Sequence, residues 1–158
     1  MPTDRLRDVA EQVAQLLDRV EPDPPPADEQ ERVLFAEAVA AVRAGGAALL
    51  DTATPHLWEY YRDMADACGE DNLGMTPLTD GDDIWEHIEL PRPPSVSRGY
   101  GPPSEPSPCY LNFEGEVSWE PEHGLQLVFD HSGTVRRVGP YTGHLTNSGS
   151  RAGLVYGG

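Results

Sequence analysis

The chain has 158 residues, about the length of one domain, and it is strongly acidic: 27 Asp and Glu against 11 Arg and no Lys give a net charge of −16. All of the carboxylates lie at or before Asp130. A negative field of this kind repels nucleic acids and anionic membrane surfaces and attracts basic proteins. The sequence shows neither a run of about 18 apolar residues nor a secretory signal, so we expect a cytoplasmic protein without a membrane partner.

Residues 1–20 predict an N-terminal amphipathic helix. Its apolar residues recur at steps of three and four, and they are Leu6, Val9, Val13, Leu16 and Val20. Thr3 is the expected N-cap. Such a stripe can dock on the chain's own domain, or it can mediate self-association through residues 3–20. Residues 21–30 contain four prolines between positions 22 and 26, which predicts a semi-rigid linker.

A second helix is expected over residues 31–51. Asp28 followed by Glu31 is typical of a helix start, and the residues after them are apolar on most faces, which indicates a helix central to the core. Gly45 and Gly46 weaken this helix or allow a close approach by a neighbouring element.

A third helix is expected over residues 56–68, because Thr54 and Pro55 before it are typical of a helix cap and a first-turn proline, and Gly69 follows it. Residues 69–83 then read as an acidic loop. Residues 91–108 contain seven prolines and predict a loop or a broken edge strand.

The hydrophobic period changes from 3.6 to 2 in the last third of the chain. Alternating apolar residues predict strands over 109–119, 125–130 and 134–139, separated by turns at 120–124 and 131–133. Gly115 fits a bulge or a close contact, and Gly133 fits a turn position with positive φ. We therefore predict an α+β domain over residues 31–146, with two or three helices on one face of an antiparallel β-meander. The N-terminal helix is appended to it, and residues 147–158 form a flexible tail.

Glu122 and His123 stand side by side in the first of these turns. A carboxylate beside an imidazole is what acid/base catalysis or a metal site uses, and His131 and His144 are candidates to join His123 around an ion. Adjacent strand residues point to opposite faces, however, and the chain lacks HExxH, paired-cysteine, P-loop and nucleophile-elbow patterns. We expect the pair to hold the hairpin turn, with partner contact or chemistry as alternatives, and we expect no cofactor.

The carboxylates of the acidic loop and of the meander are the predicted contact site. They are Asp80, Asp82, Asp83, Glu114, Glu116, Glu120 and Glu122. Because no Lys neutralises them, they suit a basic protein partner. The first hypothesis is a non-enzymatic acidic binding protein, such as an inhibitor that covers a basic toxin or enzyme. The second is a small metal-dependent or acid/base enzyme that uses Glu122 and His123.

The segment Trp119-x-x-Glu122-His123-Gly124-Leu125, followed by Val-Phe, a turn and Val-Arg-Arg-Val-Gly, resembles a bacterial domain family without an assigned function, common in actinobacteria. The segments LWEYYRDM and IWEHIEL are similar to the layout of that family, so the likeness covers roughly residues 31–146. The resemblance implies no reaction and no cofactor. Small acidic bacterial proteins of this type are often suspected to be immunity proteins of toxin systems, and an immunity-type inhibitor is what the resemblance suggests.

Overall fold

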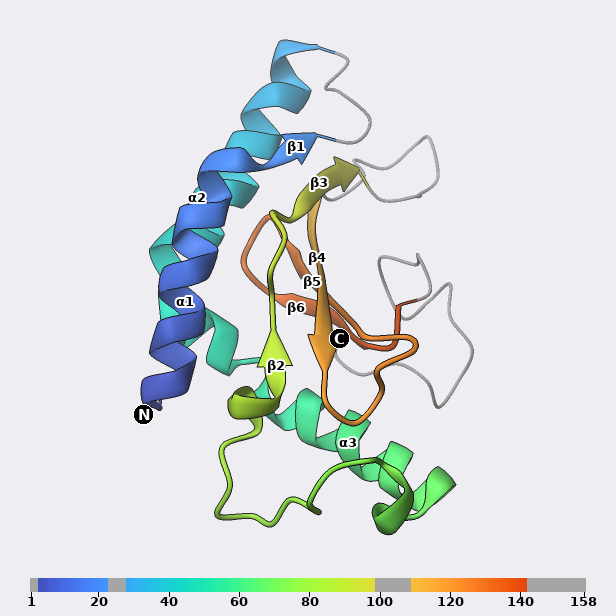
Figure 1. Ribbon diagram of the computed structural model, residues 1–158. Helices are drawn as coiled ribbons and strands as arrows, with labels where there is room; N and C mark the ends of the chain where they lie inside the picture. The colour runs from blue at the N-terminus through green and yellow to red at the C-terminus, as the bar shows by residue number, and fades with distance from the viewer. Residues whose placement is uncertain (1–2, 23–27, 99–108, 142–158) are drawn as a thin grey trace.

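The computed structural model describes residues 3–22, 28–98 and 109–141, and within them three α-helices pack around one β-sheet (Figure 1). The sheet has six strands in the order β1-β3-β4-β5-β6, with β2 also paired to β4. Helices α1 and α2 lie side by side along the sheet, and α3 lies across one end of it (Figure 1). The predicted α+β class is confirmed.

Helix α1 (Asp4–Leu16) begins where the sequence indicates, because the Thr3 side chain accepts a hydrogen bond of 3.2 Å from the Leu6 N–H. The predicted stripe is buried in the chain's own core at Leu6, Val9, Val13 and Leu17, the last in the short 3-10 helix η1 (Leu17–Arg19). Leu16 is only half-buried. The predicted linker contains strand β1 (Glu21–Pro22), which pairs in parallel with β3.

Helix α2 (Glu29–Asp51) starts at an Asp28 side chain that accepts a bond of 2.8 Å from the Glu31 N–H, as predicted. Gly46 has φ 53° and ψ −138°, so it kinks the helix, a conformation that glycine adopts without steric penalty. The expectation that α2 is central to the core is wrong, because only one side of the helix is buried. The alanines that make it apolar have small side chains, and α2 flanks the core with much of its surface exposed.

Helix α2 also has the length and composition of a helix that could cross a membrane, with a mean hydropathy of 1.7 over its most apolar window. Core helices of soluble proteins meet the same criterion. Charged side chains on or next to this helix contact other residues: Arg43 bonds to Asp18 at 2.9 Å, Arg32 pairs with Glu29, and Asp28 caps the first turn.

Helix α3 (Thr54–Cys68) has a proline in its first turn and ends at Gly69, whose φ of 88° terminates it. The predicted capping by Thr54 is wrong, because Ala53 is the N-cap. Thr54 instead accepts a bond of 2.9 Å from the Trp85 indole N–H. The loop that follows contains the 3-10 helices η2 (Glu70–Asn72) and η3 (Ile84–His87).

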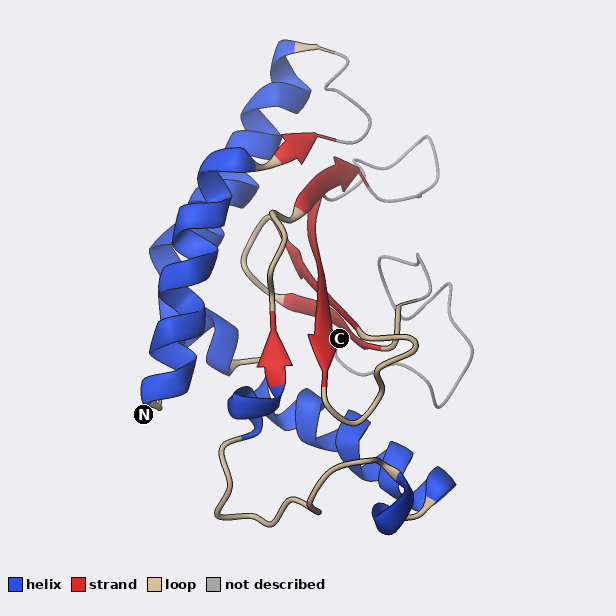
Figure 2. Ribbon diagram, in the orientation of Figure 1, coloured by secondary structure: helices blue, strands red, loops and turns tan. Residues whose placement is uncertain are grey.

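The predicted meander is confirmed as β4 (Cys109–Val117), β5 (Leu125–Asp130) and β6 (Val135–Gly139), paired antiparallel in chain order (Figure 2). Strands β2 (Ile88–Glu89) and β3 (Ser95–Arg98) both pair with the same edge of β4. Prolines separate the two strands, and β1 pairs with the other side of β3, so the strand expected at the edge of the sheet is covered there by β1. Residues 99–108 and the predicted tail lie outside the described residues.

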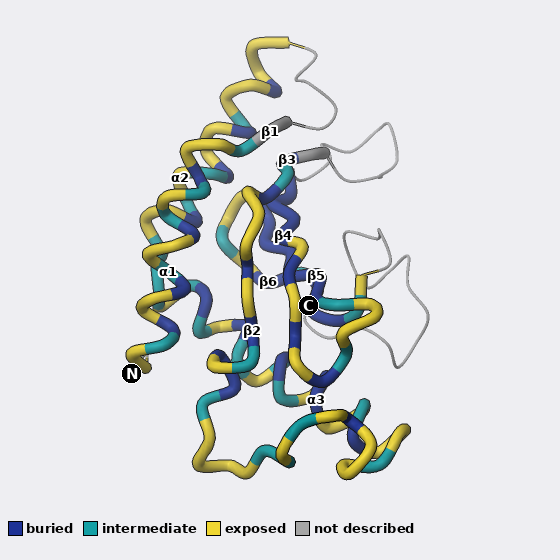
Figure 3. Tube along the Cα trace, in the orientation of Figure 1, coloured by how far each residue is buried: buried dark blue, intermediate teal, exposed yellow. Residues whose placement is uncertain are grey.

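Two features show how tightly the sheet is packed. A Cβ on Gly115 would lie 2.4 Å from the Glu89 carbonyl oxygen, so the predicted close contact is with the β2 segment. Both faces of β5 are buried, although its alternation predicts one polar face (Figure 3). On that second face Arg137 is fully buried, and its Nε donates to Gln126 Oε1 at 3.0 Å. Burial lowers the pKa of Arg137 to about 10.

Candidate functional site

The turn between β4 and β5 is fastened to α3 by the residues of the Trp-x-x-Glu-His-Gly-Leu segment. Trp119 is buried, and its ring meets those of Tyr60 and Tyr61 edge-on at centroid distances of 5.5 and 5.7 Å. The Tyr60 hydroxyl donates to the Gly124 carbonyl oxygen at 2.8 Å. Gly124 has φ 63°, and a Cβ there would lie 2.6 Å from the Gly115 carbonyl oxygen, so only glycine fits.

Glu122 and His123 lie on the outside of this turn and are exposed. The nearest carboxylate to the imidazole is that of Glu120, whose Oε1 lies 3.4 Å from His123 Nδ1, and the His123 side chain is 61% exposed. Ligand atoms of Glu120, Glu122 and His123 all lie within 4.8 Å of one another. Such a set could hold a divalent cation through oxygen and imidazole ligands. The sequence analysis named Glu120 only as a partner contact. Its i, i+3 spacing to His123 was the signal that its carboxylate could lie next to the imidazole.

His131 does not join this group. It follows the far end of β5, and six strand residues at about 3.4 Å each place that end roughly 20 Å from the first turn. His144 lies outside the described residues. Two clefts in the described part of the chain are lined by other residues, and Glu122 and His123 line neither of them. The arrangement fixes a turn at which two potential ligands, Glu122 and His123, are exposed and a third, Glu120, is partly buried.

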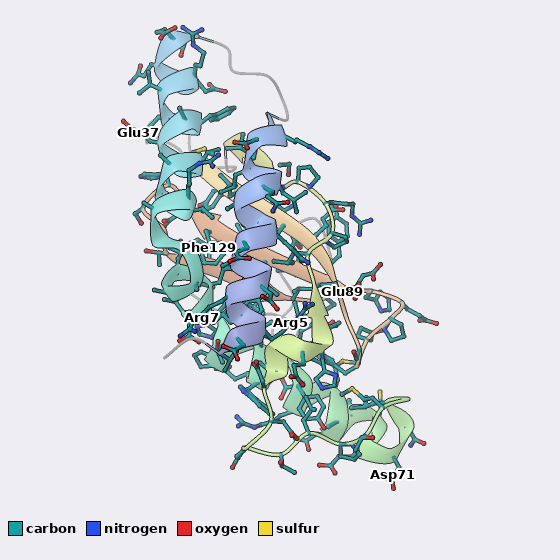
Figure 4. All side chains as sticks on the ribbon, turned by 60° about the vertical axis from the view of Figure 1, so that its left-hand side comes forward. Arg5, Arg7, Glu37, Asp71, Glu89 and Phe129 are labelled. Atoms are coloured by element: carbon teal, nitrogen blue, oxygen red, sulfur yellow. The ribbon has the colours of Figure 1, made fainter. Side chains whose placement is uncertain are left out.

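Most of the predicted contact carboxylates gather at one end of the molecule, where α3, the loop after it and the β4–β5 turn lie together (Figure 1). Residues 54–87 contain nine carboxylates and one arginine, Arg62, for a net charge of −8 with His neutral. We call the carboxylates of residues 54–87, together with Glu114, Glu116, Glu120 and Glu122, the acidic end. Figure 4 shows Asp71 at this end and Glu37 at the opposite one.

The three aspartates of the predicted acidic loop have different roles. The side chain of Asp83 accepts a bond of 3.1 Å from the Trp85 N–H and caps η3. Asp82 Oδ2 accepts a bond of 2.8 Å from the Thr79 N–H and closes the loop. The Asp80 side chain is fully exposed and lies 3.9 Å from Arg62. Asp80 is therefore the most available of the three for a partner.

The carboxylates of β4 are exposed on one face of the strand. Glu116 stands directly opposite Glu89 of β2, a residue that sequence reasoning missed because the pairing of the two strands was unknown. Glu114 accepts a hydrogen bond from the Tyr141 hydroxyl. Burial, then the charge of Glu114 and this bond, raise the pKa of Tyr141. The facing charges of Glu116 and Glu89 repel each other across the β2–β4 ladder, which destabilises the fold of the free chain.

A comparison with family models finds a match over residues 13–145, and the matching family is described as "Domain of unknown function (DUF6985)". Searches among curated proteins and among solved structures return no match. The match begins at residue 13, inside α1, so it includes the proline segment and the end of the N-terminal helix, which were expected to lie outside the likeness over residues 31–146, whereas residues 1–12 do lie outside it. The last turn of α1 and strand β1 contact the rest of the fold, which explains their inclusion. The chain belongs to the DUF6985 family of domains of unknown function.

Proposed function

We propose that this domain is a non-enzymatic binding protein that docks its acidic end on a basic protein. The observation that carries the proposal is the charge of residues 54–87, nine carboxylates against one arginine on a segment that forms one end of the molecule. Such a field accelerates association with a positive partner and selects against negative ones.

The arrangement of Glu89 and Glu116 supports this proposal. These two exposed carboxylates are cross-strand neighbours, and the described structure pairs neither with an arginine. Like charges in this position destabilise a sheet by a few tenths of a kcal/mol or more. A cationic group from a partner would remove that repulsion, so the feature is favourable in a complex and unfavourable in the free chain.

The finer form of the proposal is an immunity-type inhibitor. An inhibitor that covers the active site of a basic toxin or enzyme with an acidic surface needs no catalytic residues of its own. This agrees with a structural role for the β4–β5 turn. In this form of the proposal the protein is bacterial and acts in the cytoplasm.

The test compares two variants with equal net charge. D66N/D71N/D80N neutralises three exposed carboxylates of the acidic end, and D8N/E11Q/E37Q neutralises three exposed carboxylates of α1 and α2. Proteins captured from the native lysate are eluted from each immobilised variant with rising salt. We expect the first variant to lose a partner that the wild type releases between about 0.1 and 0.5 M NaCl, and the second to keep it. Equal retention by both variants would count against docking through the acidic end.

A second candidate function is divalent cation binding at Glu120, Glu122 and His123, favoured by the 4.8 Å limit that their ligand atoms share. It is the metal-dependent alternative to the binding protein. Elemental analysis of untagged protein and calorimetric titration with Zn²⁺ and Ca²⁺ test it, with E122Q as the variant and E37Q as the control. Less than about a tenth of an equivalent of metal, and no heat that E122Q removes, would reject it.

A further inference from the structure

A cleft of about 460 Å³ lies between α1 and the segment from Glu89 to Pro91. Pockets of roughly 300–1,000 Å³ are the size at which proteins bind ligands. Figure 4 shows Arg5 on α1 and Glu89 on the neighbouring strand, and both residues line this cleft. The cleft shares no residue with the acidic end.

The polar lining on the helix side of the cleft is elongated. Arg5, Gln12 and Arg19 are spaced by seven residues, nearly two helical turns, so they follow one face of α1 and η1. Fourteen residues at 1.5 Å each separate the backbones of the two arginines by roughly 20 Å. A ligand that contacts both must therefore be long rather than compact.

These two arginines differ from most of the other described arginines in the charge that surrounds them. Arg92 also has no carboxylate partner among the described residues, but it does not line the cleft. Arg7, Arg43, Arg62 and Arg136 each lie within 4.0 Å of a carboxylate, and Arg32 pairs with Glu29. Arg5 and Arg19 have no carboxylate partner among the described residues, although the chain has 27 carboxylates. Arg5 is instead held by the carbonyl oxygens of Trp85 at 3.3 Å and Ile88 at 3.0 Å. A guanidinium has five N–H donors, so both arginines keep donors for a carboxylate.

The middle of the cleft has a different chemistry. Gln12 and Gln15 offer amide donors and acceptors that make no hydrogen bond within the described chain, and they match the N–H and C=O groups of a peptide. Leu16 and Leu90 add apolar contact area. Glu89 is the single carboxylate of the lining, and it disfavours further negative charge on a ligand beyond the carboxylates that the two guanidinium groups would pair with.

We propose that this cleft binds an extended peptide of about six residues that carries a carboxylate near each end and is uncharged between them. Six extended residues at about 3.3 Å span the roughly 20 Å between Arg5 and Arg19. The carboxylates pair with the two guanidinium groups, and the glutamines bond to the peptide backbone between them. The cleft shares only Glu89 with the residues that support the docking of a basic partner, and each proposal stands without the other.

The probe is a blocked hexapeptide with Glu at both ends and Ala-Thr repeats between them, titrated into the full chain by calorimetry at about 20 mM ionic strength. A matched peptide with Gln at both ends is the ligand control. R19Q removes one guanidinium that makes no hydrogen bond or ion pair among the described residues, and R7Q removes a guanidinium of α1 that lies outside the cleft. Sodium phosphate alone tests for a site that takes any small anion.

We expect the Glu peptide to bind, the Gln peptide to bind at least about tenfold more weakly, and R19Q but not R7Q to weaken the Glu peptide by about tenfold, the effect of one charge-assisted contact. Absence of binding by the Glu peptide overturns the proposal. Equal loss in R19Q and R7Q overturns it too, because the effect is then one of net charge. Phosphate binding that depends on Arg19 and displaces the peptide reassigns the cleft to small anions.

Discussion

The hydroxyl of Tyr60 in α3 donates a hydrogen bond of 2.8 Å to the carbonyl oxygen of Gly124 in the β4–β5 turn. The ring of Tyr60 also packs edge-on against Trp119. In Y60F the ring contact remains and the hydrogen bond is lost, so we expect the free energy of unfolding to fall by about 1 kcal/mol. Urea denaturation of the two proteins measures this difference.

Y61F serves as the comparison. The Tyr61 hydroxyl accepts a bond of 2.7 Å from the Leu78 N–H, so its loss affects the loop after α3 and not the turn. Hydrogen exchange should accelerate around Gly124 in Y60F and around Leu78 in Y61F. Identical exchange patterns in the two variants would contradict separate roles for the two hydroxyls.

A methyl group at Gly124 should destabilise the fold more than one at Gly74. Both glycines have positive φ, 63° and 73°, so alanine pays a backbone penalty of about 1–2 kcal/mol at either position. Only at Gly124 would the new Cβ meet a backbone atom, the Gly115 oxygen at 2.6 Å, whereas nothing lies within 4 Å at Gly74. We expect G124A to lose at least about 1 kcal/mol more than G74A in thermal or urea unfolding. Equal losses would place the turn farther from β4 than the structure has it.

Asp130 should contribute stability that is lost in acid. Burial opposes ionisation of its carboxyl, but hydrogen bonds from Ser132 and Thr134 and the charge of Arg136 outweigh burial and lower its pKa below the usual 3.8. The unfolded chain therefore binds the proton at higher pH than the folded one. The contribution is complete above about pH 4 and disappears as the pH falls through the folded pKa.

The variant D130N tests this directly, because its side chain does not ionise. We expect it to be less stable than the wild type at pH 7 and the difference to shrink steadily between about pH 4 and pH 2, measured by urea denaturation at each pH. S132A removes one hydrogen-bond donor to the carboxylate, so its free energy of unfolding at pH 7 should lie between those of the wild type and D130N. A difference that is independent of pH would assign the loss to packing alone.

Neutralising Glu116 should stabilise the free protein. Its charge faces that of Glu89 across the β2–β4 ladder, so E116Q should raise the free energy of unfolding by a few tenths of a kcal/mol. About 0.5 M NaCl screens the repulsion and should remove most of the gain. E37Q, which neutralises an exposed carboxylate of α2, is the control. A gain that persists in high salt would not be electrostatic.

Local signals in the sequence were sufficient for the elements themselves. Thr3 and Asp28 begin their helices as side-chain caps, Gly69 ends α3, and Gly133 has φ 85° in the second hairpin turn. Each of these depends on a residue and its near neighbours, which is what a sequence displays. The alternation of apolar residues likewise identified the three strands of the meander.

The relations between distant segments could not be predicted in this way. The pairing of β1 with β3, and of β2 and β3 with one edge of β4, joins segments that prolines separate in the sequence. The burial of Arg137 and the exposure of much of α2 depend on tertiary packing, which overrides periodicity. For the candidate site, the sequence identified the turn and its acidic residues. The contact of Trp119 with α3 and the cleft beside α1 join segments that are distant in the sequence, so local patterns did not predict them.

The prolines between β2 and β3 have a consequence for how the protein behaves at high concentration. Strand β1 covers only Ser95 and Val96 of β3, so an uninterrupted strand over the rest of this flank would offer a row of amide hydrogens to a second molecule and favour edge-to-edge aggregation. Pro91, Pro93 and Pro94 remove three of those hydrogens in four residues of the flank nearest the arginine-lined cleft. A peptide that binds along that flank is therefore recognised by side chains. Such recognition is selective, whereas an unpaired strand edge would bind almost any extended chain through its backbone.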